Sequence, residues 1–149
     1  MKENSFEKYY PLVGGALCAF VYLGIFNLYP KFALAKGFRD IFIAAITINA
    51  ISIGFLATAK AILISIHSSD IVKWMKETGA YDTTIKYFMS PLILSMLCAI
   101  WSMFLLLIDF GNPIKYIVLC IALWIWIFMS SMLAMYRIIH IFSKILYKA

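Results

Sequence analysis

Four long apolar runs, separated by short polar connectors, set the pattern of the sequence. The runs extend over residues 11–29, 41–66, 87–108 and 113–136. A helix of about 20 predominantly apolar residues crosses the ~30 Å hydrocarbon core of a bilayer, and each run reaches that length. Pro11 and Pro91 fall in the first turns of their runs, where proline is tolerated. The pattern predicts an all-α membrane protein with four transmembrane helices.

Two of the predicted helices continue beyond the bilayer. After Ile66 no helix-breaking residue occurs before Gly79, which suits a left-handed cap at the end of a helix. The fourth helix continues from Arg137 into a stripe of basic residues opposite a stripe of apolar ones. We expect the second and fourth helices to extend into the cytoplasm on the same side of the membrane.

Composition agrees with a membrane protein of one domain. Of the 149 residues, 64% are hydrophobic and 13% are charged, whereas soluble domains average roughly 45–50% and about 25%. Four spans occupy about 80 positions, so only short connectors remain, and a single domain over residues 1–149 is expected. The net charge is +6, but the basic residues flank apolar runs, where they meet lipid headgroups. No direct nucleic-acid partner is expected.

The distribution of lysine and arginine predicts the orientation, because cytoplasmic loops retain positive charge. With the amino terminus inside, the inner side holds more basic residues than the outer side. The inner residues are Lys2, Lys8, Lys73, Lys76, Lys86, Arg137, Lys144 and Lys148, and the outer ones are Lys31, Lys36, Arg39 and Lys115. Both termini are therefore expected in the cytoplasm.

The first run is longer than the about 7–15 apolar residues of a signal peptide, which disfavours cleavage after it.

One face of the second helix is made of small residues. At about 100° per residue, the small positions of this run fall on one side of the helix. They are Thr47, Ala50, Gly54, Ala57, Thr58, Ala61, Ser65 and Ser68. Small residues at this spacing let helix backbones approach closely in lipid. The face predicts a helix-packing seam, either within one four-helix subunit or as a subunit interface or pore-side face. Gly14, Gly15 and Gly24 of the first run are interpreted as further close-packing sites.

The opposite side of the same helix carries a polar stripe of Asn49, Lys60 and His67. Polar residues inside a membrane usually face protein or water and are functional candidates. Lys60 either extends its charged end to the headgroups or belongs to an ion or proton pathway. Asp109, after the third run, either pairs with a basic residue or forms a ring at the outer mouth of an oligomeric pore. These four residues are the candidate pore or polar-face residues.

No catalytic or metal-binding constellation occurs in the sequence. The only histidines are His67 and His140, and Cys18, Cys98 and Cys120 lie in apolar runs without a C-x-x-C pair. A structural zinc site needs four converging ligands, and a catalytic one needs three. None of the acidic residues lies deep in a span, where a proton-coupled exporter needs a desolvated carboxylate. We expect no enzymatic activity, no cofactor and no metal.

The cytoplasmic extensions offer a candidate surface for a partner or for the membrane. Lys73, Trp74 and Lys76 form an amphipathic turn with neighbouring apolar residues, and Arg137 begins the basic stripe of the fourth helix. Such a turn either lies on the membrane surface or receives a soluble partner. We expect a signal to arrive on this face of the protein.

Several local features lie in a characteristic order along the chain. Tyr22-Leu23 precedes the first loop, Tyr29-Pro30 begins it, Arg39-Asp40 opens the second span, and Glu77-Thr78-Gly79 ends the long helix. In this layout and in overall length the chain resembles the RexB family, small four-span inner-membrane proteins of phage exclusion systems. The resemblance implies an abortive-infection effector of the bacterial inner membrane, in which a soluble cytoplasmic sensor triggers passage of ions.

Three functions compete at this point. The first is an anti-phage membrane effector that forms a homo-oligomer and an ion-permeable, depolarising pore gated by a cytoplasmic partner. The second is a non-conducting, membrane-anchored sensor or scaffold that recruits a soluble defence effector. The third is a phage holin, whose lesions pass large molecules. Assembly in the bilayer is expected for the first, and partner binding at the cytoplasmic face is expected for the first two.

Overall fold

The computed structural model describes residues 5–29, 37–65, 77, 79–108 and 115–148. This part of the chain forms four long helices and contains no strand. They are α1 (Ser5–Leu28), α2 (Phe38–Ser65), α4 (Ala80–Leu106) and α5 (Lys115–Lys148). All four contain a segment long and apolar enough to cross a membrane. The prediction of an all-helical chain with four candidate membrane spans is confirmed.

Three helices begin earlier than the apolar runs predicted, and α2 differs least, with its start at Phe38 rather than at residue 41. α1 begins at Ser5 rather than at residue 11, and α4 begins at Ala80 rather than at residue 87. Pro11 and Pro91 consequently lie inside their helices. The apolar runs mark only the segment suited to hydrocarbon, whereas a helix continues through polar residues as long as its backbone bonds are satisfied.

The ends of the second and fourth helices were expected to extend beyond the bilayer. α5 has 34 residues, which corresponds to about 51 Å and exceeds the ~30 Å hydrocarbon core. The predicted continuation of the second helix beyond Ser65 lies outside the described residues. Gly79 has a left-handed φ of 66° between the helical residue Glu77 and the start of α4. The prediction of a left-handed glycine at this position is confirmed.

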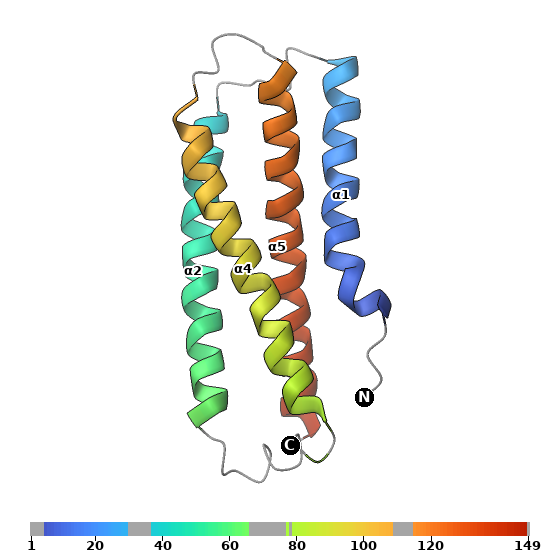
Figure 1. The fold of residues 1–149 in the computed structure, drawn as a ribbon, viewed down its shortest axis with the longest axis vertical. Coiled ribbons are helices and arrows are strands. Elements are labelled where there is room, and N and C mark those ends of the chain that lie inside the picture. The colour runs from blue at the N-terminus through green and yellow to red at the C-terminus, as the bar shows by residue number, and fades with distance from the viewer. Residues whose placement is uncertain (1–4, 30–36, 66–76, 78, 109–114, 149) are drawn as a thin grey trace.

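The helices run alternately up and down (Figure 1). The beginning of α1 and the end of α5 lie at the same end of the bundle, and α4 crosses in front of α5. α4 packs against both α2 and α5, while α1 packs against α5. Helix α5 therefore lies between α1 and the rest of the bundle, and α4 lies between α2 and α5 in the order of packing.

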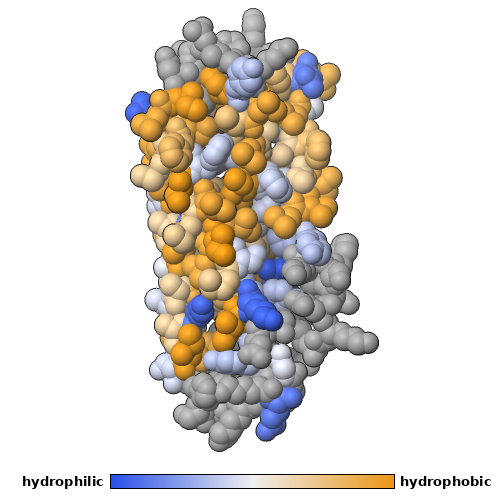
Figure 2. Space-filling view, in the orientation of Figure 1, coloured by the Kyte–Doolittle hydropathy of each residue, from blue (hydrophilic) through white to orange (hydrophobic). Residues whose placement is uncertain are grey.

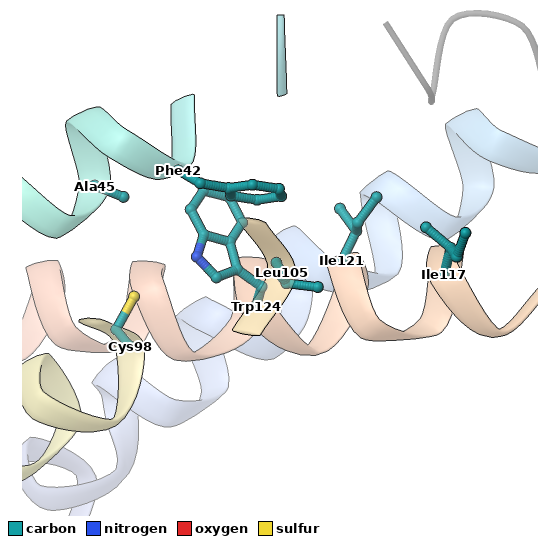
Figure 3. Packing of buried hydrophobic residues seen from close by; sticks show 7 residues of the cluster. All are labelled: Phe42, Ala45, Cys98, Leu105, Ile117, Ile121 and Trp124. Atoms are coloured by element: carbon teal, nitrogen blue, oxygen red, sulfur yellow. The ribbon is translucent and has the colours of Figure 1, made fainter. Parts of the chain in front are cut away.

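Buried apolar side chains form two clusters between α2, α4 and α5. The larger cluster consists of Phe42, Ala45, Cys98, Leu105, Ile117, Ile121 and Trp124, and the smaller one of Leu56, Leu63, Tyr87, Phe88 and Ile138. In Figure 3 the ring of Phe42 lies against the indole of Trp124, and their centroids are 4.9 Å apart. The clusters fill the two halves of the bundle and leave a polar segment between them.

The outer surface is apolar over most of its height. Figure 2 shows hydrophobic side chains covering most of the described part of one face, with strongly hydrophilic ones near its upper edge and in its lower part. Large side chains such as Phe20, Phe55 and Leu107 are exposed. Soluble monomers rarely expose such extensive apolar surface, so these helices are suited to lipid contact.

Candidate functional site

Polar side chains are buried along the interior of the bundle. They are Asn49, Ser52, Thr84, Ser95, Ser102, Ser130, Ser131 and Arg137. In a membrane each buried polar group needs a partner inside the protein, because lipid tails offer none. The arrangement of these side chains therefore determines how the helices fit together.

A central polar layer joins three helices. It consists of Asn49 on α2, Ser95 on α4 and Ser131 on α5. The Asn49 amide donates to the carbonyl oxygen of Ala45 at 2.8 Å, and Ser131 Oγ donates to Asn49 Oδ1 at 3.3 Å. The hydroxyls of Ser95 and Ser131 are 2.8 Å apart. These bonds hold α2, α4 and α5 in one register at mid-height.

A second layer lies next to the first. Trp124 Nε1 donates to Ser102 Oγ at 2.7 Å, and Ser102 Oγ donates to the carbonyl oxygen of Cys98 at 2.8 Å. The indole of Trp124 also stacks on Phe128, with ring centroids 5.3 Å apart. Trp124 thus satisfies its one polar atom while its rings remain in an apolar environment, which is the usual condition for burying tryptophan.

Asn49 is fully buried in this structure, with 0% of its side chain exposed. The sequence assigned it to a polar face that avoids lipid. The structure places the Asn49 side chain in the interior of the bundle, where Ser131 donates to it. Asn49 therefore belongs to the contact between α2 and α5.

Lys60 lies apart from Asn49, near the end of α2. It is half-buried, and its ammonium group donates to the sulfur of Met89 on α4 at 3.2 Å. Five residues separate it from Ser65, which corresponds to about 7.5 Å along the helix. The headgroup position and the ion-pathway role that the sequence offered for Lys60 both stay predictions. His67 and Asp109, the other two candidate pore residues, lie outside the described residues.

The small face of α2 points away from the bundle. Its described members Thr47, Ala50, Gly54, Ala57, Thr58, Ala61 and Ser65 are all exposed. A side-chain carbon added at Gly54 meets no atom within 4 Å. The sequence offered two interpretations of this seam, and one was a contact with another helix of the same chain. The structure does not show that contact. The reason is that the bulky and amide side chains of the opposite face, including Phe42, Asn49 and Leu56, fill the interior.

Close packing occurs instead between α1 and α5, at Gly14 and Gly15, where the sequence predicted it. The same prediction for Gly24 is wrong, because a carbon added there meets no atom within 4 Å. A carbon added at Gly15 would overlap Ser130 Oγ and lie 2.5 Å from the carbonyl oxygen of Trp126. Two further bonds link these helices. Tyr10 donates its hydroxyl to the carbonyl oxygen of Leu133 at 3.1 Å, and Trp126 Nε1 donates to that of Leu12 at 2.9 Å.

Arg137 was expected on a surface for a partner or the membrane, and the structure corrects this. Its side chain is 6% exposed, and its guanidinium carbon lies 4.4 Å from the centre of the Tyr87 ring. A cation held over an aromatic face in a desolvated place is stabilised by about 2 kcal/mol. The early start of α4 brings Tyr87 beside α5, which the apolar run alone did not indicate. Lys73, Trp74 and Lys76 lie outside the described residues.

The chemistry available to this interior is hydrogen bonding. Within the described ranges, no group of three His, Cys, Asp or Glu side chains is placed to hold a metal ion. Cys18, Cys98 and Cys120 carry free thiols. The buried serines of α4 and α5 were not among the residues predicted from the sequence, although Ser95 and Ser102 are seven residues apart in an apolar run. That heptad spacing was the available signal for a polar helix interface.

Comparisons of the chain with protein-family models, with curated proteins and with solved structures find no match.

We predict a measurable coupling within the central polar layer. Ser95→Ala and Ser131→Ala should each lower the free energy of unfolding, and the double variant should lose less than the sum. The shared hydroxyl bond should give a coupling of about 0.6 kcal/mol, the average for membrane helix interfaces. Denaturant titration of helicity in detergent measures it. Thr58→Ala is the control, because its exposed hydroxyl bonds to carbonyl oxygens of its own helix. If the losses in the free energy of unfolding of the two single variants add up to the loss of the double variant, Ser95 and Ser131 do not interact.

Proposed function

We propose that this chain is a membrane effector of an anti-phage system that self-associates in the bilayer and forms an ion-permeable, depolarising pore. The observation that carries the proposal is the outward direction of the small face of α2. Glycine, alanine and small hydroxyl residues allow close backbone contact in lipid, and that contact is unused inside the subunit. A second copy of the chain is the partner proposed for it.

The packing inside the subunit indicates where ions would pass. Asn49, Ser95 and Ser131 bond to one another, and Phe42 and Trp124 fill the space beside them. A path within the subunit would have to break these contacts. A path between subunits would instead run along the small face, where the hydroxyls of threonine and serine supply polar groups for a narrow pore. We therefore propose that ions pass between subunits, beside this seam, rather than past Asn49 within one subunit.

The topology supports an orientation with both termini in the cytoplasm. The first and last described residues lie at the same end of the bundle, and the charge distribution predicts that this end is the inner one. The resemblance to the RexB family supports the bacterial inner membrane, the antiviral role and a soluble cytoplasmic sensor as partner. The sequence places Lys73, Trp74 and Lys76 on the side where such a sensor would bind.

We predict that Gly54→Leu disrupts self-association. The leucine side chain would hold a neighbouring backbone away from α2, so the oligomer should dissociate to monomers in native mass measurements from mild detergent. Gly24→Leu is a matched control, because Gly24 also has nothing within 4 Å and lies on α1, outside the proposed seam. An oligomer that survives Gly54→Leu, or that is lost equally with Gly24→Leu, would reject the seam.

Conduction is tested in planar bilayers with the purified protein, alone and together with the soluble proteins encoded by adjacent genes. We expect ion currents that the Gly54→Leu variant lacks, without release of a large dye from vesicles of the same composition. Dye release would favour a holin. An assembled protein that binds its soluble partner and passes no current would instead be the non-conducting scaffold.

A further inference from the structure

Two lysines from different helices lie close to one another on the lipid-facing side of the bundle. Lys60 on α2 places its ammonium group 3.2 Å from the sulfur of Met89 on α4. Lys86 lies three residues before Met89 on the same helix and is exposed. Residues three apart on a helix are surface neighbours. Lys86 is therefore a surface neighbour of Met89, which Lys60 contacts at the seam between α2 and α4.

Both lysines lie at the depth of lipid headgroups. Lys60 is five residues from the end of α2, and Lys86 is six residues from the start of α4, at the same end of the bundle. These separations correspond to about 7.5 Å and about 9 Å. The 28 residues of α2 span about 42 Å, so about 6 Å at each end exceeds the hydrocarbon core. The lysines thus lie near the boundary between tails and headgroups.

The contact between Lys60 and Met89 leaves donors of the Lys60 ammonium group available to a ligand. A thioether is a weak hydrogen-bond acceptor, and an ammonium group has three donors. Asp40 and Glu77, the acidic residues whose side chains the structure describes, form no ion pair with either lysine. At the edge of a low-dielectric region, two neighbouring cations attract an anion strongly.

An apolar track leads away from this pair along α4. Met89, Ile93, Met96 and Ile100 are exposed and follow Lys86 at spacings of three or four residues. Side chains at this spacing form one continuous stripe on a helix. The stripe begins at the lysines and runs towards the middle of the membrane. A ligand that matches the whole feature has an anionic head and an apolar tail.

We propose that Lys60 and Lys86 bind the phosphate-containing headgroup of an anionic phospholipid, whose acyl chain lies along the exposed stripe of α4. Basic residues between transmembrane helices are suited to such headgroups. The site lies on another side of α2 from the small face, because Lys60 is next to the buried positions Leu56 and Leu63. It is therefore independent of self-association and of conduction.

The test is retention of lipid by the intact protein. The full chain is taken from nanodiscs of equal phosphatidylcholine and phosphatidylglycerol, and bound lipids are counted by native mass spectrometry. We expect preferential retention of phosphatidylglycerol. Each of Lys60→Gln and Lys86→Gln should reduce that preference about fivefold, the equivalent of about 1 kcal/mol for each basic residue near the surface. The double variant should lose about 25-fold.

Three controls separate this site from general charge effects. Arg39→Gln removes an exposed cation at the opposite end of α2 and should change the preference less than twofold. Lys60→Arg with Lys86→Arg should retain the lipid. Inorganic phosphate, which has no acyl chain, should not displace it. Unchanged retention in the double glutamine variant, an equal loss with Arg39→Gln, or displacement by phosphate would each overturn the proposal. Circular dichroism verifies folding, and the Gly54→Leu variant should still bind the lipid.

Discussion

Phe42→Ala should lower the free energy of unfolding by about 3–5 kcal/mol, the range for removing a buried aromatic side chain. Phe42 is 0% exposed, and its ring lies edge-on to Trp124 at 4.9 Å. Phe38 lies on its other side, with centroids 5.9 Å apart. Loss of the ring leaves a cavity in the larger cluster. The hydrogen bonds of the polar layer fix α2 relative to α5, so the two helices cannot move together far enough to fill it.

Phe55→Ala on the same helix is the matched control for Phe42→Ala. Its side chain is 52% exposed and faces outward, where lipid tails replace the lost contacts. We expect a change below about 1 kcal/mol. Titration of helicity with a denaturing detergent measures both variants under the same conditions. Equal losses for the two substitutions would mean that the cluster around Trp124 does not form the core of the folded protein.

Replacing Gly15 by alanine should loosen the attachment of α1 to α5, and Gly15→Val should remove it. The added carbon would overlap Ser130 Oγ and approach the backbone of Trp126 to 2.5 Å. Backbone cannot swing aside as a flexible side chain can, so α1 has to move outward as a unit. Overpacking of this kind costs about 1–3 kcal/mol. The bonds from Tyr10 and Trp126 to the facing backbones would be stretched by the same movement.

Pulsed electron spin resonance measures that movement between labels at two exposed positions, Phe20 on α1 and Leu119 on α5. We expect a longer and broader distance distribution in the Gly15 variants. Gly24→Ala, on the same helix with open space around it, should leave the distribution unchanged. An unchanged distance between the two labels in Gly15→Val would show that the packing of α1 against α5 does not depend on Gly15.

For the two faces of α2, the sequence pattern predicted which residues share a face but not which face is buried. Helical periodicity separated Asn49 from Gly54 correctly, since they lie on opposite sides of the same helix. Periodicity does not say which side meets the other helices. The structure turns the side of Asn49 inward because an amide in lipid requires a partner, and Ser131 supplies one. The small side remains outside, where its threonine hydroxyls bond to their own backbone.

Arg137 illustrates the same limit for a charged residue. Its position after the last apolar run, within a basic stripe, favoured an exposed location. It lies over the ring of Tyr87, which is 50 residues earlier in the chain and belongs to the neighbouring helix α4. A cation at the end of a span has two low-energy places, the headgroups or an aromatic face, and only the neighbouring helix decides between them.

The sequence by itself determined four apolar helices, their approximate bounds, the left-handed conformation at Gly79 and the close packing at Gly14 and Gly15, because these follow from local hydrophobicity, backbone sterics and side-chain size. It did not distinguish Gly24, which has open space around it. Only the tertiary structure decided that Asn49, Ser95 and Ser131 form one layer, that the small face of α2 remains uncovered, and that Lys60 contacts Met89. Contacts between distant helices depend on how complementary surfaces fit together, and no local pattern contains that information.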